Sequence, residues 1–421
     1  MSEDAVVVGG GLAGLVAARH LARSGRDVTL YERAETVGGR VRTTEVDDFV
    51  FDQGFQVLFT GYPAVRRELD LDALDLRYFR PGACLARPGE RTVLSDPLRD
   101  PGAALETLFN RDITTRDKVR TLRLRRELGR LSLADLDRYD DRDIATFLDD
   151  RGFSRRFRDR FAAPFYGGIT LDRSLETSAF VFAATFKYLS EGRTAVPATG
   201  MGGIPRQLVA AATAAGARVE TGRTVEALDA DDTGVSLTVD GDWVSADAAV
   251  VATDPTTARD LTGVAAIPTD GRGCVTQYYA LANRADLGVG RRIVLNTRTE
   301  GPNQVVPVST VAPEQAPADE TLLSATFLGQ PAADPDDLAE QTRSTLEAWF
   351  PERSFDALRL LRTTAVPFAQ VAQPPGFRAD RPAVTAPEGP VVLAGDYTRW
   401  SSIQGAIESG RVAAKAVRAE S

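Results

Sequence analysis

The chain of 421 residues opens with short apolar runs that alternate with helical periodicity. Val6 to Val8 predict a strand, residues 15–22 have the spacing of a helix, and residues 28–32 predict a second strand. Two later apolar runs, 248–253 and 391–396, predict further buried strands. The first three elements therefore form a βαβ unit.

Between the first strand and the first helix lies the sequence Gly-Gly-Gly-Leu-Ala-Gly, at positions 9 to 14. Gly9 permits a tight turn, Gly11 lets backbone approach a pyrophosphate at the helix N-terminus, and Gly14 allows the helix to pack closely on the strand. Glu32, at the end of the second strand, can accept hydrogen bonds from a ribose diol. Together these features predict a dinucleotide-binding turn. A glycine-rich turn in some other α/β protein is the alternative.

Residues 97–189 read as largely helical, with apolar residues three and four positions apart and many Arg and Asp residues on the other faces. Residues 178–189 are apolar nearly all round. Such a helix is either buried in a core or in contact with lipid or an apolar ligand. Core burial is the simpler interpretation, and a tunnel mouth is the alternative.

The second half of the chain is richer in strand signals. A helix is expected over residues 336–349, after Pro335 and before Pro351, and residues 365–368 mark a return to the first region. Strands of one sheet are expected at residues 274–282, 292–296, 304–309 and 322–328.

Three stretches resemble the flavin amine oxidase superfamily, which includes amine oxidases, protoporphyrinogen oxidases and phytoene-type carotenoid desaturases. Glu32 to Arg40, with the pair Gly38-Gly39, resembles the motif after its second strand. The sequence 395–410, Gly-Asp followed by the start of a helix, resembles its C-terminal FAD signature. The turn at 52–54 resembles an element that lies against the flavin, and a surface hairpin turn is the alternative.

The resemblance implies a bound FAD. It places Arg40 beside the diphosphate, Asp396 on a ribitol hydroxyl, and the amides of residues 404–406 at the flavin N1 and C2 carbonyl, where the helix dipole adds partial positive charge. Residues 397–401 contain no cysteine of the kind through which monoamine oxidases attach FAD, so non-covalent binding is expected. The residues expected to bind FAD are Gly9, Gly11, Leu12, Ala13, Gly14, Glu32, Arg33, Gly39, Arg40, Gln53, Gly54, Phe55, Val225, Gly395, Asp396, Gln404, Gly405 and Ala406.

The two FAD motifs stand at opposite ends of the chain, so the cofactor domain must be assembled from separated segments. The expected fold class is α/β, with a Rossmann-like FAD-binding domain and a mixed sheet-and-helix substrate domain. The expected FAD-binding segments are 1–60, 195–258 and 364–421. The expected substrate-binding segments are 61–194, whose helical part is about 97–190, and 259–363.

The amino-acid composition argues against several classes of function. The single histidine, His20, excludes histidine metal sites and Ser-His-Asp triads. The net charge of −9 argues against nucleic acid as a partner. Two distant cysteines, Cys84 and Cys274, are typical of reduced thiols in a cytoplasmic protein. No segment reads as a transmembrane helix, and peripheral contact with a membrane stays open. The surface is acidic and lysine-poor, which fits either a salt-rich cytoplasm or the codon bias of a GC-rich genome.

No side chain stands out as a general base. Residues 273–333 contain no lysine, although many amine oxidases place one near the flavin on a strand of this domain. Lys187, Tyr397 and Trp400 are the weak candidates for a catalytic role. Hydride removal by the flavin from a large apolar molecule, such as an isoprenoid or carotenoid, is therefore preferred, with oxygen or a quinone as electron acceptor. A porphyrinogen or amine oxidase, or a non-catalytic FAD-binding protein, remains the alternative.

Overall fold

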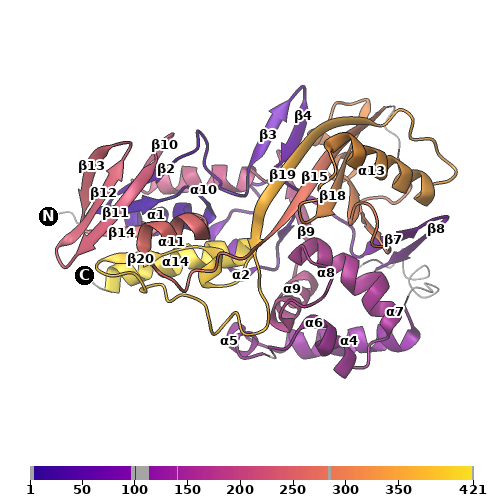
Figure 1. Cartoon of the computed structure of the whole chain (residues 1–421), viewed down its shortest axis with the longest axis horizontal. Coiled ribbons are helices and arrows are strands. Elements are labelled where there is room, and N and C mark those ends of the chain that lie inside the picture. Colours follow the sequence, from indigo (N-terminus) through magenta and orange to yellow (C-terminus); the bar gives the residue numbers. More distant parts are fainter. Residues whose placement is uncertain (1–3, 96–99, 101–112, 140, 283–285, 420–421) are drawn as a thin grey trace.

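The computed structural model describes residues 4–95, 100, 113–139, 141–282 and 286–419. Figure 1 shows a region of parallel strands and helices that contains both chain ends, a second sheet at the far end, and a group of helices below that sheet. The part of the expected helical segment before residue 113 lies, apart from Asp100, outside the described residues.

The first region is built on a five-stranded parallel sheet. Its strands are, in spatial order, β10 (Arg218–Thr221), β2 (Asp27–Glu32), β1 (Asp4–Val8), β14 (Ala248–Val251) and β20 (Val391–Leu393). The expected βαβ unit is present, with α1 (Leu12–Arg23) between β1 and β2. Strands far apart in sequence thus become neighbours, as an assembly from separated segments requires.

Side chains of β1 alternate between the two faces of this sheet. Ala5 and Val7 belong to the core that includes α1, α10 (Gly203–Ala214) and α14 (Ile403–Ala419). Val6 and Val8 pack instead with a three-stranded antiparallel sheet on the other face. That sheet contains β11 (Val225–Asp231), β12 (Gly234–Val239) and β13 (Asp242–Ala246). Because both faces are covered, the strands are apolar nearly throughout.

The first and last long helices pack directly on each other. A Cβ atom added to Gly410 of α14 would lie 2.1 Å from the carbonyl oxygen of Ala13 in α1. Only glycine permits this approach of the two backbones. The contact brings the C-terminal motif to the N-terminal glycine turn.

The second sheet has seven strands, mostly antiparallel. Its strands are, in spatial order, β19 (Arg359–Val371), β15 (Gly271–Ala282), β18 (Glu320–Leu328), β17 (Gln304–Pro307), β16 (Ile293–Asn296), β7 (Ala83–Arg87) and β8 (Glu90–Leu94). The four strands expected from sequence are all members. Helix α13 (Pro335–Trp349) covers one face of this sheet through Leu346 and Trp349.

Short elements connect these regions. They are β3 (Thr43–Val46), β4 (Phe49–Asp52), β5 (Leu58–Phe59), α2 (Pro63–Glu68), β6 (Leu76–Tyr78), β9 (Thr194–Pro197), α11 (Pro255–Thr262), α12 (Val308–Val311), the 3₁₀ helix Pro313–Gln315 and the 3₁₀ helix Asp396–Thr398. The expected borders after residues 194, 258 and 363 each fall inside a continuous element, namely β9, α11 and β19. The expected borders therefore do not coincide with the ends of elements.

The helical group forms the remaining wall of the molecule. It contains α4 (Thr115–Gly129), α5 (Leu133–Asp137), α6 (Ile144–Asp150), α7 (Arg155–Phe157), a π-helical turn (Arg158–Ala162), α8 (Ala163–Thr170) and α9 (Ala179–Glu191). Phe180, Phe182 and Tyr188 of α9 are buried. Helix α9 is thus largely buried, as its apolar circumference predicted.

Candidate functional site

A single large cavity of about 1560 Å³ runs from the glycine turn at β1 to the helical group. Its lining combines both halves of the molecule: residues of the N-terminal motif, of β19, of the C-terminal motif, and of helices α4, α8 and α9. Ligand pockets for one small molecule commonly have about 300 to 1,000 Å³. The cavity therefore has room for more than one such ligand.

The glycine turn leaves open space where a ligand would lie. Gly9 has a φ of +103°, and a Cβ atom there would lie 2.8 Å from the carbonyl oxygen of Ala252. A Cβ atom on Gly14 would lie 1.9 Å from the carbonyl oxygen of Gly9, so helix and strand need this glycine to pack. By contrast, a Cβ atom on Gly11 would meet no protein atom within 4 Å, and Gly11 lines the cavity. The turn thus presents bare backbone to the cavity at the start of α1.

The carboxylate of Glu32 is held beside this turn. Its Oε2 accepts a hydrogen bond from the amide of Gly10 at 2.7 Å, and its Oε1 accepts one from the amide of Ala34 at 2.9 Å. Glu32 is buried and lines the cavity. Each carboxylate oxygen retains a further lone pair that can accept from a ligand hydroxyl.

Arg40 and Asp396 form an ion pair at the cavity wall. The Nη2 of Arg40 donates to the Oδ1 of Asp396 at 2.7 Å, and its Nη1 donates to the carbonyl of Ala369 at 3.0 Å. Ser401 donates to the other oxygen of Asp396 at 2.7 Å. Both members of the pair line the cavity, so the N-terminal and C-terminal motifs are joined by a charged contact.

The start of α14 has hydrogen bonds of its own. The amide of Gly405 donates to the Oγ of Ser402 at 2.9 Å, and the amide of Ala406 donates to the carbonyl of Ser402 at 2.9 Å. A flavin would compete with Ser402 for these two amides, and their expected role as flavin donors stays a prediction. The side chain of Gln404 accepts from the amide of Ala64, and neither Gln404 nor Gly405 lines the cavity. Ala406 does line it.

The turn after β4 faces the second sheet. Gln53, Gly54 and Phe55 all line the cavity, and Gln53 accepts a hydrogen bond from Arg42 at 3.1 Å. Gly54 has a φ of +83°, and the nearest atoms to a Cβ added there are the Thr276 hydroxyl at 3.9 Å and the Cys274 thiol at 4.0 Å. This turn is therefore not a surface hairpin.

Asp52 anchors the same turn inside the protein. Its carboxylate accepts hydrogen bonds from the hydroxyl of Thr43 and from the amide of Met201, and its carbonyl accepts one from Tyr278. Burial raises the pKa of Asp52 to about 6, although both hydrogen bonds oppose the shift. Burial likewise raises the pKa of the Cys274 thiol on β15 to about 11, so the thiol is protonated at neutral pH.

The far part of the cavity is apolar. Rings of Phe161 and Phe165 stack with centroids 5.2 Å apart, and Phe182 and Phe186 stack at 5.9 Å. All four line the cavity, although Phe182 is also part of the buried core. Both interpretations of the apolar helix 178–189 therefore apply at once, because one side of α9 is core and another side borders the cavity.

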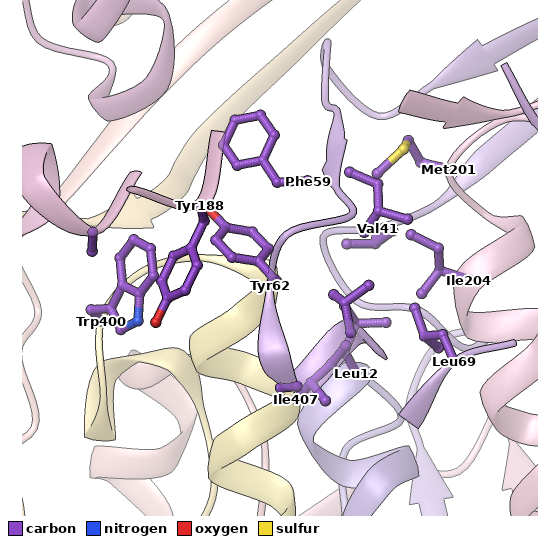
Figure 2. Packing of buried hydrophobic residues seen from close by; sticks show 14 of the residues in the cluster. Leu12, Val41, Phe59, Tyr62, Leu69, Tyr188, Met201, Ile204, Trp400 and Ile407 are labelled. Carbon is purple, nitrogen blue, oxygen red and sulfur yellow. The ribbon is translucent and has the colours of Figure 1, made fainter. Parts of the chain in front are cut away.

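The three weak catalytic candidates occupy different places. Trp400 lines the cavity and packs edge-on against Tyr62, with ring centroids 5.9 Å apart; Figure 2 shows both rings beside Tyr188. Tyr397 is buried beneath Gly395 and does not line the cavity. Lys187 also lies outside the lining, and its ammonium donates to Glu191 and to the carbonyl of Leu128.

Most of the other expected cofactor residues gather around the first part of the cavity. Leu12, Ala13, Arg33, Gly39, Val225 and Gly395 line it, whereas Gly14 packs behind the turn. Sequence reasoning missed Arg223, Thr253, Gln304 and Gln370, which also line the cavity. Thr253 is the last residue of the predicted strand 248–253, so its position could be predicted; the other three carry no local motif.

These residues fit a dinucleotide. The bare backbone at Gly11 and Gly39, the N-terminus of α1 and the buried carboxylate of Glu32 provide space, partial positive charge and a hydroxyl acceptor, respectively. The fold and this site together define a nucleotide-binding oxidoreductase. Residues 12–418 match the model of the flavin containing amine oxidoreductases, and the chain belongs to this family. It is an FAD-dependent oxidoreductase, and the resemblance found in the sequence is confirmed.

Similar proteins include carotenoid enzymes. The chain is 30% identical over 284 residues to a phytoene dehydrogenase from Streptomyces griseus, a match that covers 60% of this chain and 54% of that protein. It is 37% identical over 116 residues to a carotenoid 3,4-desaturase from Haloarcula japonica, 24% of this chain and 23% of that protein. These matches span about half, or less, of the length of the curated relatives.

A solved structure shows the same fold over the whole chain. An oxidoreductase from Methanosarcina mazei superposes with a TM-score of 0.75, at 17% identity, over 98% of this chain and 100% of that chain. At this identity the likeness concerns the fold, which is of the α/β amine oxidase type with mixed sheets and helices. Within the described residues, no helix combines the length and apolar character needed to cross a bilayer.

Proposed function

We propose that the chain binds FAD without a covalent bond and removes hydride from a large apolar substrate of the isoprenoid or carotenoid kind. The observation that carries this proposal is the continuity of the cavity. One space of about 1560 Å³ joins a glycine turn suited to a dinucleotide with a wall of phenylalanine side chains. The identified relatives named for carotenoid chemistry support the same substrate class.

In the proposed site, FAD binds in the Rossmann manner. Its adenosine half lies near Val225, with the ribose diol at Glu32 and the diphosphate at Gly11 and the N-terminus of α1. Asp396 accepts from a ribitol hydroxyl while Arg40 holds its carboxylate in place at 2.7 Å. The expected amides of α14 donate to the flavin ring, those of Gly405 and Ala406 in competition with Ser402.

The proposed reaction removes two hydrogens from neighbouring carbons. When bound, FAD supplies the acceptor for the hydride and its two electrons, and the second hydrogen leaves as a proton. Oxygen or a quinone then takes up the two electrons. The aromatic wall orients the chain of the substrate and excludes water, because rings such as Phe161 and Phe186 present apolar surface to it.

An amine or porphyrinogen oxidase is the second candidate on this scaffold. A lysine near the flavin would favour an amine oxidase, but Lys187 lies outside the cavity and Lys118 lies on α4, the helix that borders the distant end of the cavity. A carbocyclic or polyene substrate needs no such base. A non-catalytic flavin-binding protein is the third alternative. Turnover of any donor would exclude it, and the absence of turnover would favour it.

The test uses the purified full chain loaded with FAD. Anaerobic mixing with phytoene dispersed in detergent should bleach the flavin absorbance and yield a product with a longer conjugated system. Putrescine and protoporphyrinogen serve as competing donors in parallel samples. Bleaching by putrescine alone, or by protoporphyrinogen alone, would contradict the proposed substrate class.

Two further measurements complete the assignment. Acid precipitation should release all flavin into the supernatant, whereas flavin that stays with the precipitate would contradict non-covalent binding. Re-oxidation of the reduced protein by oxygen, compared with re-oxidation by a soluble quinone, identifies the acceptor. No reduction by any of the three donors would favour the non-catalytic alternative.

A further inference from the structure

A basic helix borders one end of the cavity. Several residues that line the cavity are exposed, among them Arg33 beside the glycine turn, Pro367 on β19, and Leu122 and Arg126. Two of them, Leu122 and Arg126, lie on α4. Figure 1 shows α4 at the lower edge of the helical group, on the side away from α13.

The charge of this helix opposes that of the chain. Residues 115–130 contain seven arginine and lysine residues but two acidic residues, whereas the whole chain has a net charge of −9. The capping box of Thr114 and Asp117 starts the helix, and Leu124 and Leu128 anchor it in the core. The remaining surface of α4 is therefore free to be strongly basic.

Exposed positions of α4 form one face, which we call the outer face of α4. Arg116, Val119, Arg123, Arg126 and Arg130 recur at three- and four-residue spacing and are all exposed. Val119 is 44% exposed and the adjoining Leu122 is 45% exposed. Among the described residues, Val46 and Trp243 are the only other large apolar side chains that are exposed.

We infer that the outer face of α4 docks on a lipid bilayer with anionic headgroups, so that the cavity opens into the membrane. Basic side chains near an anionic surface each contribute about 1 kcal/mol of attraction, and apolar side chains such as Val119 and Leu122 insert at the headgroup boundary. The inference rests on the proposed function in one respect, namely that an apolar substrate enters at this end of the cavity.

Binding of an anionic group of the substrate would account for fewer of these arginine residues than binding of a membrane does. Arg116, Arg123 and Arg130 do not line the cavity, so a ligand inside it would not reach them. A surface extended beyond this end of the cavity, with cations on both sides of an apolar centre, matches a sheet of headgroups instead. A membrane would also supply the medium in which a long apolar substrate is dissolved.

The experiment is sedimentation of the FAD-loaded full chain with vesicles. Vesicles of phosphatidylcholine with added phosphatidylglycerol are compared with vesicles of phosphatidylcholine alone. The chain should sediment with the anionic vesicles and be released by high salt, which screens the attraction. The Arg116→Gln/Arg123→Gln double variant should bind about thirtyfold more weakly, which is roughly fivefold for each charge removed.

The matched control is Arg298→Gln/Arg353→Gln, which removes the same charge from exposed positions outside α4. This variant should bind vesicles as the natural chain does. Equal sedimentation with both kinds of vesicle, or equal loss in both double variants, would overturn the inference. Self-association that depends on Arg116 and Arg123, without vesicle binding, would assign the face to a second copy and overturn it too.

The result can be separated from the proposed reaction. Neither Arg116 nor Arg123 lines the cavity, so turnover of substrate dispersed in detergent should be the same in the double variant and the natural chain. If vesicles do not bind while turnover persists, the docking surface is wrong and the reaction stands. If vesicles bind while no donor is oxidised, the docking surface stands and the reaction is wrong.

Discussion

The two ends of the cavity are built on different principles. Around the glycine turn, single atoms decide the structure: Gly14 has no room for a Cβ atom, and Glu32 accepts from two particular amides. Around α8 and α9, rings of similar size pack at centroid distances of 4.6 to 5.9 Å without a polar contact that fixes them. In the proposed site, the first end would recognise one ligand in detail, whereas the second would select by size and apolarity.

The largest effect that tests this difference between the two ends is expected within the glycine turn. Gly14→Ala should destabilise the chain by at least about 3 kcal/mol, because its Cβ would lie 1.9 Å from the carbonyl oxygen of Gly9. Gly11→Ala should leave the free energy of unfolding within about 1 kcal/mol of the natural value and lower FAD affinity more than about tenfold. Urea unfolding and flavin content measure both effects. Equal stability of the two variants would refute the assigned packing.

Asp52 is held by Thr43, Met201 and Tyr278 inside the protein and should give a pH dependence. Its folded-state pKa, about 6, is above its ordinary value of 3.8, so the folded chain holds a proton that the unfolded chain has lost between these values. The contribution of Asp52 to stability should therefore be greatest below about pH 4, fall by roughly 3 kcal/mol as pH rises to about 6, and then stay level.

Asp52→Asn should remove this contribution and make the chain more stable than the natural protein at pH 7. Unfolding by urea at a series of pH values measures it, with the exposed Asp356→Asn as the control. A natural chain whose stability rises between pH 4 and 6, with an unchanged slope in Asp52→Asn, would contradict this account.

At the cofactor end, Asp396→Asn should lower FAD affinity roughly tenfold to a hundredfold, because it removes the charge from a hydrogen-bond acceptor and leaves Arg40 without its ion-pair partner. Titration of the flavin-free variant with FAD, followed by fluorescence, gives the affinity. Asp356→Asn is a suitable comparison, since Asp356 is exposed and does not line the cavity. Flavin affinity equal to that of the natural chain would remove Asp396 from the site.

The smallest effect is expected at the apolar end. Phe161→Ala should raise KM for the apolar substrate about tenfold while flavin content stays unchanged, because only shape and buried area are lost. Phe161→Leu keeps most of that area and should stay within about threefold. Steady-state kinetics in detergent measures both variants. A loss of flavin in Phe161→Ala would show that the two ends are not as separate as described.

The same contrast explains what the sequence could predict. Backbone motifs such as Gly9 to Gly14 act locally, so their role could be predicted from the spacing of the glycine residues. Most of the expected cofactor residues line the cavity. The hydrogen bonds that the amides of Gly405 and Ala406 donate to Ser402, a residue within the same turn, were not predicted. The pairing of Arg40 with Asp396 joins positions 356 residues apart, and no local pattern could reveal it.

Residues of the apolar wall were recognisable only as a group. The helix 178–189 was predicted to be buried or to meet a ligand. The structure buries one side of it and places another side at the cavity, because burial depends on which neighbours cover each side. Gln304 and Gln370 reach the cavity through the register of the second sheet. Register between distant strands depends on the whole fold, so the sequence around each glutamine carries no sign of it.

The long strand β19 has a mechanical consequence. It pairs with β15 along nearly its whole length, and the carbonyl of Ala369 near its end accepts from Arg40 at the cofactor. In the proposed site, β19 therefore connects Arg40, beside the cofactor, to the second sheet on the opposite side of the cavity. Its pairing with β15 would hold the distance between these two walls constant, so ligands would enter past the helices instead.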